Sequence, residues 1–352
     1  MKLLPVKKRK IAILFTAGLG DALLYIPLLK ELKKKQFHVT GIFYSRYKND
    51  CLFDDTLLNV KVHINSKLSL LMYVLTRLKH FANIYINHTG GGKIITTAAK
   101  ICGKRTTKTN AFTKKLVPGK RNKKVVLNFT DAEQNLHLLY SSQNAAIKQI
   151  SDYFLPHPVI QSQLVKKYIA NQRGPYFIVQ VSAGNNATPY KNWPVKHWLT
   201  LMNMLCKSHK TIDFIILGDA TETEYIKAFN DPGFTNCKVL IGKTSVEEAF
   251  NLVAHSNGYI GLDSGIMHMA VTLQKKTVSI FGASSETLYG YSFLDSTNHK
   301  VIISDINCRP CSGWINANTT RVSDPMQCPD FACLSTIDPL FVYNQVNAHF
   351  HL

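Results

Sequence analysis

Short apolar runs alternate with segments of helical periodicity along most of the chain. In the first half, residues 10–16 form an apolar run, residues 21–35 have apolar positions at helical spacing, and residues 38–44 form a second apolar run. This strand–helix–strand order predicts a parallel sheet with right-handed crossovers. The other elements predicted in this half are two strands, a helix and a polar loop, at 82–87, 124–129, 133–150 and 104–124.

The same alternation starts again near Gly174. The segment 176–181 (YFIVQV) predicts a strand and the segment 195–209 a helix. Ser245 and Glu248 fit a capping box at the start of a later helix. The remaining strands are predicted at 212–217, 237–241, 258–262 and 276–281, and the remaining helices at 221–230, 245–256 and 265–274.

Two successive α/β series predict two Rossmann-like domains that face a central cleft. The length of 352 residues agrees, since a single core rarely grows beyond about 250–300 residues. Prolines and glycine around residues 155–175 mark the linker. The predicted limits are an N-terminal domain at 1–165, a C-terminal domain at 170–335 and a terminal helix at 336–352.

The composition is that of a globular protein, with 45% hydrophobic and 10% aromatic residues. No apolar run reaches the roughly 18 residues of a spanning helix. The basic start followed by an apolar stretch has the outline of a signal peptide, but Gly18, Gly20 and Asp21 interrupt it and no clear cleavage site follows. We therefore expect this stretch to be a first buried strand and the protein to be cytoplasmic.

The formal net charge of +20 is unevenly distributed. Residues 1–170 hold 29 of the 42 Lys and Arg residues but only 8 of the 22 Asp and Glu residues. Between Asp55 and Asp131 there are 15 basic residues and no acidic one. A field of one sign on one domain predicts a polyanionic partner, which could be an anionic membrane surface, a phosphorylated glycolipid or nucleic acid. A general basic bias is the simpler alternative, but it leaves the near-neutral second half unexplained.

The segment 17–21 (AGLGD) follows the first predicted strand. Gly18 and Gly20 allow a tight turn and close approach of a ligand. A dinucleotide fingerprint would need a third glycine where Leu23 stands. Asp21 fits a general base aimed into the cleft. Taken alone, it could equally cap the following helix.

The segment 182–194 (SAGNNATPYKNWP) follows the first strand of the second domain. Its small and polar residues supply amide donors, Thr188 a hydroxyl and Lys191 a positive charge, so it fits a phosphate-binding loop. The alternative is an ordinary surface loop in which Trp193 packs on the core.

The segment 261–270 (GLDSGIMHMA) joins a strand end at Asp263 to a helix that begins near Gly265. Backbone amides at such a helix start bind anions, and ligands of open α/β sheets lie at the strand ends. His268 could donate to a phosphate oxygen. The alternative is that Asp263 is only the N-cap and His268 a buried core residue.

In chain order, the segments GLGD (18–21), KNWP (191–194), GKTS (242–245) and DSGIMH (263–268) resemble the signatures of glycosyltransferase family 9, the heptosyltransferase-like group. The resemblance runs over roughly residues 10–340. It implies a GT-B fold and metal-independent, inverting transfer from a nucleoside-diphosphate sugar bound by the C-terminal domain, with no cofactor required. The implied donor is ADP-heptose, and the implied acceptor is a lipopolysaccharide core or another phosphorylated glycolipid or oligosaccharide, held by the basic domain at the inner membrane face.

The resemblance also implies roles for individual residues. Asp21 matches the catalytic base, with Gly18, Gly20 and Asp263 shaping the site. Glu222, after Gly218, matches an acidic residue near the nucleoside ribose, with Glu224 as the alternative. The residues that match donor-diphosphate contacts are Thr188, Lys191, Ser264, Gly265, Met267 and His268.

Three departures from the family pattern cluster on the donor side. The usual His-Pro-Gly is replaced by a segment from Gln180 to Gly184, the usual Arg before Trp193 by Asn192, and the usual Pro-Thr after Gly282 by Ala283-Ser284. These departures bear on the identity of the base and the sugar rather than on the type of reaction.

Four of the eight cysteines approach the spacing of a four-thiolate zinc site. A disulfide and reduced, unligated thiols remain open as alternatives. These four are Cys308, Cys311, Cys328 and Cys333, whereas the scattered Cys51, Cys102, Cys206 and Cys237 are predicted to be small buried apolar residues.

Two rival functions are considered. An NADP-dependent dehydrogenase would use the glycine turn together with Ser45 and Arg46, but the missing third glycine and Asp21 argue against it. A noncatalytic polyanion-binding or nucleic-acid-binding protein would explain the charge, but it leaves the loops of the second half unexplained. No specific nucleic-acid partner is therefore expected.

Overall fold

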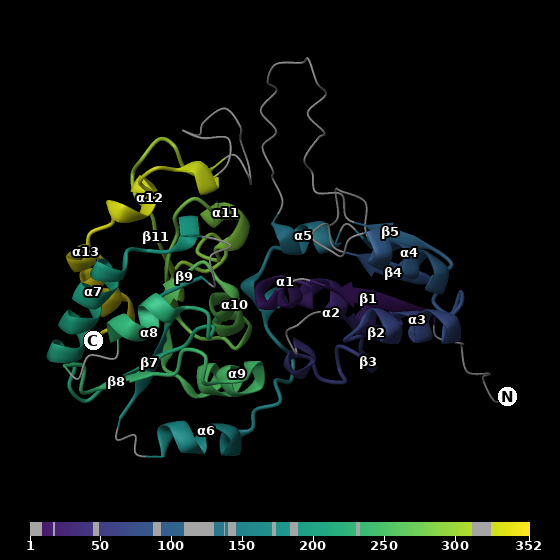
Figure 1. Cartoon of the computed structure of the whole chain (residues 1–352), viewed down its shortest axis with the longest axis horizontal. Coiled ribbons are helices and arrows are strands. Elements are labelled where there is room, and N and C mark those ends of the chain that lie inside the picture. Colours follow the sequence, from purple (N-terminus) through teal and green to yellow (C-terminus); the bar gives the residue numbers. More distant parts are fainter. Residues whose placement is uncertain are drawn as a thin grey trace. The chain divides into compact units, whose positions relative to one another are not determined.

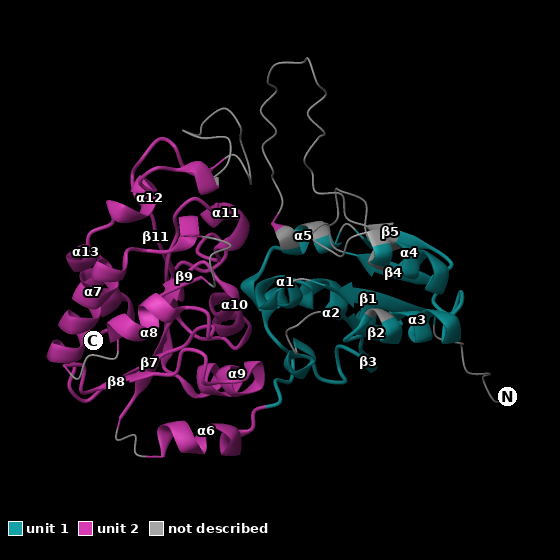
Figure 2. Cartoon of the chain, in the orientation of Figure 1, with its two compact units in different colours: residues 1–114, 131–159 teal, residues 115–130, 160–352 magenta. Residues whose placement is uncertain are grey.

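The computed structural model divides the chain into two compact units, residues 1–114 with 131–159 and residues 115–130 with 160–352 (Figure 2). Each unit is an α/β layer structure in its own right (Figure 1). The residues whose structure is described are 9–16, 18–44, 49–86, 93–108, 130–136, 138–139, 146–170, 174–183, 189–229, 233–311 and 325–352.

The first unit contains a parallel sheet of five strands in the order β3-β2-β1-β4-β5. The first three strands extend the sheet from β1 toward one edge, and β4 and β5 extend it from β1 toward the other edge, as in a Rossmann sheet. In the central strand β1, residues 11–15 are all buried, as expected for a strand covered on both faces. The strands are β1 Lys10–Phe15, β2 His38–Phe43, β3 Val60–His63, β4 Asn83–Ile86 and β5 Thr106–Lys108.

Two groups of helices accompany this sheet. Helix α2 contacts α5 and the 3₁₀ turn η3, whereas α3 contacts α4. The helical elements are α1 Leu19–Leu23, α2 Ile26–Lys34, η1 Asn49–Leu52, α3 Lys67–Thr76, α4 Lys93–Cys102, α5 Asp131–Leu136 and η3 Ile150–Tyr153.

The first unit corrects three expectations from the sequence. The single helix predicted at 21–35 is broken at Leu24 and Tyr25, because Pro27 can stand only in the first turn of a new helix. The loop predicted at 104–124 includes the short strand β5. Of the helix predicted at 133–150, the structure describes α5, which begins at Asp131 and ends at Leu136. The strand predicted at 124–129 lies outside the described residues.

The second unit contains a parallel sheet of six strands in the order β11-β10-β9-β6-β7-β8. Counted from β6, this is the full 3-2-1-4-5-6 order of a Rossmann sheet. The two inner strands β6 and β9 are buried along their whole length. The strands are β6 Tyr176–Val179, β7 Asp213–Ile216, β8 Cys237–Val239, β9 Gly258–Leu262, β10 Thr277–Ile280 and β11 His299–Ile302.

Helices cover both faces of this sheet (Figure 1). Helices α8 and α13 pack on α7, while α6 and α10 pack on α9. Because α6 belongs to the second unit, the change of unit comes at residue 160, a few residues before the limit expected from the sequence. The capping box of Ser245 and Glu248 at the start of α9 is confirmed. The helical elements are α6 Ser162–Ile169, η4 Pro189–Lys191, α7 Val195–Ser208, α8 Thr223–Phe229, α9 Val246–His255, α10 Gly265–Thr272, α11 Glu286–Tyr289, η5 Pro325–Gln327, α12 Ala332–Ser335 and α13 Pro339–Phe350.

Trp193 anchors the loop that follows β6 in the core of the second unit. Its ring is fully buried and packs edge-on against Trp198, with ring centroids 5.0 Å apart. Its indole N–H donates to the carbonyl of Ile337 at 3.1 Å. Because Lys191 lies only two residues earlier, this anchor fixes where the lysine leaves the core.

Within the described part of the chain, no helix is both long and apolar enough to cross a bilayer.

Candidate functional site

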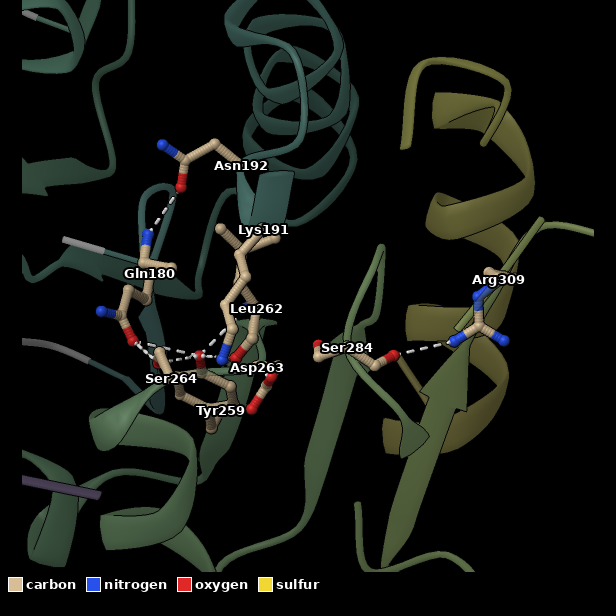
Figure 3. Close-up of polar contacts among 10 residues, drawn as sticks. Gln180, Lys191, Asn192, Tyr259, Leu262, Asp263, Ser264, Ser284 and Arg309 are labelled. Carbon is tan, nitrogen blue, oxygen red and sulfur yellow. Dashed lines mark hydrogen bonds and ion pairs between the residues drawn. The ribbon is translucent and has the colours of Figure 1, made fainter. Parts of the chain in front are cut away.

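Strands β6 and β9 lie side by side in the second sheet, and the chain leaves them toward opposite edges. Ligands of open α/β sheets bind outside the carboxyl ends of the strands at such a switch point. Here the loops that follow β6, β9 and β10 come together (Figure 3). Their side chains define the candidate site.

An ion pair joins the loop after β6 to the end of β9. The ammonium Nζ of Lys191 lies 2.6 Å from Oδ2 of Asp263, whose side chain is only 2% exposed (Figure 3). Burial pushes the pKa of the Asp263 carboxyl upward, but Lys191, His268 and Ser284 more than offset this effect and hold the pKa below its usual range. Asp263 is therefore a buried carboxylate, and the ammonium of Lys191 is held above the strand ends.

Helix α10 begins directly after this carboxylate. Its N-cap is Ser264, so the alternative that Asp263 is the N-cap is wrong. The Ser264 hydroxyl does not cap the helix; it donates to Oε1 of Gln180 and lies 3.2 Å from the hydroxyl of Tyr259. The amides of the first helical turn, starting at Gly265, have no carbonyl four residues earlier within the helix, so they are available to an anion.

Among these helix-start residues, Met267 is 1% exposed. Its thioether is therefore packed in the core, and its expected contact with a diphosphate is restricted to the backbone amide.

His268 lies one turn into α10 and is buried. Its Nδ1 is 2.6 Å from the hydroxyl of Tyr291. Burial and the positive charge of Lys191 lower its pKa to about 4, although Asp263 acts in the opposite direction. The imidazole is thus neutral at neutral pH. If Tyr291 donates to Nδ1, the ring proton is on Nε2, where it can be donated to a ligand.

Glu222 follows β7 and is also buried. One of its oxygens, Oε1, accepts from the amide of Asp219 at 3.2 Å, and a Cβ at Gly218 would come within 2.3 Å of the other, Oε2. Gly218 therefore makes room for the carboxyl group. Burial raises the pKa of Glu222 to about 7, the hydrogen bond from Asp219 and that from Ser182 acting against it. Its neighbour Glu224, the alternative from the sequence, is exposed.

The loop after β6 is described in part, and Thr188 lies outside the described residues. Asn192, which replaces the usual Arg, accepts from the amide of Ala183 at 2.8 Å through Oδ1. This bond ties the two described ends of the loop together.

Three side chains at the site were missed in the sequence, namely Tyr259, Tyr291 and Arg309. The guanidinium of Arg309 donates to the carbonyl of Ser284 at 3.2 Å (Figure 3). It also donates to the carbonyl of Gly282 at 3.1 Å and pairs with Glu286 at 2.8 Å. It thereby fixes the loop after β10. No motif marked these residues, because each contributes through a partner that only the fold brings close.

In the first unit, the glycine turn occupies the equivalent switch point between β1 and β4. Gly18 is the N-cap of α1, so the alternative that Asp21 caps this helix is wrong. Asp21 is the third residue of α1, and its Oδ2 would lie 3.9 Å from a Cβ at Gly18. Ser45 and Arg46, the residues of the dehydrogenase alternative, lie outside the described residues.

The four cysteines at the end of the chain are partly brought together. Cys311 and Cys333 are buried, and burial together with the neighbouring thiols raises the pKa of Cys333 to about 12. Cys311 Sγ lies 3.9 Å from the carbonyl of Cys308. Among the described residues, no group of three or more His, Cys, Asp or Glu side chains is placed to hold a metal ion, so the zinc expectation gains no support.

A family model for glycosyltransferase family 9 (heptosyltransferase) matches residues 120–319, more than half of the chain. The chain belongs to this family. The match includes the Lys191–Asp263 pair, the start of α10 and Glu222, so the site of the second unit lies within the family's shared region.

Individual proteins similar to this chain are also heptosyltransferases. The lipooligosaccharide heptosyltransferase 2 of Campylobacter jejuni is 26% identical over 313 residues, which cover 86% of this chain and 89% of that protein. The lipopolysaccharide heptosyltransferase 2 of Escherichia coli is 28% identical over 143 residues, which cover 37% of this chain and only 40% of that protein. The match to this relative thus spans less than half of its length.

The fold is also that of solved family structures. The structure of the E. coli ADP-heptose LPS heptosyltransferase II superposes with a TM-score of 0.66 at 16% identity, and the alignment covers 97% of this chain and 98% of that one. The predicted α/β fold of GT-B type, with two Rossmann-like units, is confirmed.

Proposed function

We propose that this family 9 protein is an inverting, metal-independent glycosyltransferase that moves a heptose from an ADP-linked donor to a lipopolysaccharide core or another phosphorylated glycolipid or oligosaccharide. The observation that carries the proposal is the meeting of Lys191 and Asp263 directly before the start of α10, at the switch point of the second sheet. Glu222 follows the adjacent strand β7. The names of the relatives, which are heptosyltransferases of lipopolysaccharide and lipooligosaccharide, support the same reaction.

In this mechanism the second unit holds the donor. The amides at the start of α10 and the ammonium of Lys191 would bind the diphosphate, with Thr188 assisting. They would stabilise the negative charge that develops when the bond to the sugar breaks. The neutral His268 would donate Nε2–H to a phosphate oxygen, and Glu222 would accept from a ribose hydroxyl.

The first unit would supply the base. Asp21 would take the proton of the acceptor hydroxyl as that oxygen attacks the anomeric carbon and the nucleoside diphosphate leaves. Attack from the face opposite the leaving group inverts the anomeric configuration. The position of Asp21 after β1, at a sheet switch point, supports this role.

A transferase of the same kind with another nucleotide sugar is the second candidate. It is favoured by Gln180, which begins the segment that replaces the His-Pro-Gly of the family pattern and whose Oε1 accepts from Ser264 at the start of α10. A changed side chain at this point changes the groups that surround the donor.

The basic first unit would hold an anionic acceptor and associate with the membrane that carries it, in the cytoplasm at the inner membrane. Free nucleic acid would not be a specific partner.

A binding panel tests the donor assignment. Calorimetry with ADP, UDP, GDP, NADP and single-stranded RNA should give the tightest binding to ADP, and Lys191→Ala should weaken that binding at least tenfold. Product analysis with ADP-heptose and a truncated lipopolysaccharide acceptor then tests transfer. Preference for UDP or GDP would favour the second candidate, and tight binding of RNA alone would refute both.

A further inference from the structure

Helix α3 of the first unit is apolar on two opposite sides. Its inner side places Leu70 and Val74 in the cluster that also includes Leu14 and Ile84 of the sheet. A surface helix of a globular protein normally turns polar residues outward. Here the outer side is apolar as well, and it is formed by Leu68, Leu71, Met72 and Leu75, with Leu78 in the turn that follows.

We call these five residues the α3 apolar face. Each of them is between 53% and 68% exposed. They are five of the fifteen exposed large apolar side chains among the described residues, so a third of this set is concentrated within eleven consecutive residues. On helix α4, which contacts α3, Ile94 and Ile101 are exposed too. Such a concentration marks an interaction surface rather than scattered exposure.

Basic side chains lie near one end of this face, where α3 and α4 end, and we call them its basic surround. Arg77, Lys79, Lys100, Lys104 and Arg105 are all exposed. Lys79 Nζ donates to the carbonyls of Lys100 and Gly103 at 2.9 and 3.2 Å, which brings the end of α3 and the end of α4 together.

The positive charges also affect His80, which follows α3. Partial burial lowers the pKa of His80, and the positive charges of Lys10, Arg77 and His38 lower it further. The stretch between Asp55 and Asp131, which includes α3 and α4, contains no acidic residue.

From this arrangement we infer that the α3 apolar face and its basic surround form the docking surface by which the protein lies on an anionic lipid bilayer. The apolar side chains enter the region between headgroups and acyl chains, and the basic ones stay at the level of the phosphates. The inference rests on the proposed membrane association and names the residues that carry it.

Charge complementarity decides between the possible occupants. A second copy of the chain placed on the same face would bring two fields of one sign together. Nucleic acid would bind to the basic residues but would leave the five apolar side chains exposed to water. An anionic bilayer satisfies both kinds of side chain.

Flotation of the full-length protein with vesicles tests the inference. Wild type should float with vesicles of phosphatidylcholine containing about 30% phosphatidylglycerol and much less with phosphatidylcholine alone. Leu71→Glu/Leu75→Glu should reduce the bound fraction at least tenfold. The matched control is Leu340→Glu/Phe341→Glu on α13, whose side chains are 55% and 49% exposed, and it should float like wild type.

The basic surround is tested in the same way. Lys100→Glu/Lys104→Glu should also lose binding, whereas Lys207→Glu/Lys210→Glu, exposed lysines of the second unit, should keep most of it. Circular dichroism and melting curves establish that each variant is folded. If Leu71→Glu/Leu75→Glu floats as well as wild type, the inference is overturned. Failure of the wild type to float would overturn it too.

Two further measurements separate this inference from its alternatives. Sedimentation without vesicles should give the same mass for wild type and Leu71→Glu/Leu75→Glu, and a dimer lost in the variant would assign the face to a second copy instead. ADP binding should be equal in both proteins. Flotation without ADP binding would leave the docking surface standing and refute the proposed donor, and the reverse result would refute only the docking surface.

Discussion

Lys191 and Asp263, 72 positions apart in the sequence, form an ion pair of 2.6 Å in which the carboxylate is 2% exposed. A buried carboxylate costs several kcal/mol of desolvation unless a partner compensates it. The lysine therefore holds Asp263 in its ionised form, and in the proposed mechanism it also presents a positive charge to the donor.

The first prediction concerns this pair. Lys191→Met should lower the free energy of unfolding by about 3 kcal/mol, because it leaves the Asp263 carboxylate buried without its cation. The double variant Lys191→Met/Asp263→Asn should recover a large part of this loss. Urea unfolding of the single and double variants measures the coupling. The exposed Lys196→Met is the control and should change stability by less than about 0.5 kcal/mol. Additive effects in the double variant would show that the pair is not coupled.

The second prediction concerns Tyr291 as a positioning residue for His268. Tyr291→Phe removes the hydroxyl that is 2.6 Å from Nδ1 of the imidazole, so the ring should lose its fixed orientation and tautomer. We expect the dissociation constant for the nucleoside diphosphate to rise about fivefold to tenfold, the value of one hydrogen bond.

A double-mutant cycle checks this relationship. If Tyr291 acts through His268, then Tyr291→Phe should have little further effect in a His268→Ala background. Tyr343→Phe is the matched control, since its hydroxyl bonds to Ser208 at 2.9 Å on an exposed surface, and calorimetry should find its affinity unchanged. Equal losses in both backgrounds would separate Tyr291 from His268.

Within the described residues, the sequence predicts every inner strand of both sheets, but of the edge strands it predicts only β8. β1, β6 and β9 are buried on both faces, so they stand out as continuous apolar runs. β5 is polar (TTK), and it has a neighbour on one side only. Its pattern is therefore that of a loop. The break in the first helix follows from Pro27, a signal present in the sequence but outweighed by the helical spacing around it.

The candidate site shows the same division. The motifs around Lys191 and Asp263 are visible separately, but their contact depends on the order of β6 and β9 in the sheet. Tyr291 and Arg309 belong to no motif and become site residues only through His268 and the loop after β10. A fold is needed to identify residues that act through others.

The third prediction is a pH dependence set by Glu222. Its pKa is about 7 in the folded protein, above the ordinary value of 4.5. The folded state therefore binds the proton more tightly than the unfolded state, so this contribution is fully present below about pH 4.5 and is lost as the pH rises through 7. Glu222→Gln removes the cost of ionisation. The variant should be more stable than wild type at pH 8.5 by at most about 3 kcal/mol, and the gain should fall below about 1 kcal/mol near pH 5.

Melting curves across this pH range measure the effect. The control is Glu224→Gln, an exposed neighbour on α8, which should show no such difference between pH 5 and pH 8.5. A gain for Glu222→Gln that is constant with pH would mean that ionisation of this carboxyl is not its cause.

The fourth prediction separates chemistry from donor binding. Asp21→Asn keeps the size of the side chain but cannot accept the proton of the acceptor, so turnover should fall by about 10²–10⁴-fold. Affinity for the nucleoside diphosphate should be unchanged, because the proposed donor residues belong to the second unit. Stability should fall by less than about 1 kcal/mol, the usual worth of a carboxylate in the first turn of a helix. Glu31→Gln, another carboxyl of the first unit, is the control for turnover. Steady-state kinetics and calorimetry on the same samples give both quantities, and near-normal turnover of Asp21→Asn would exclude Asp21 as the base.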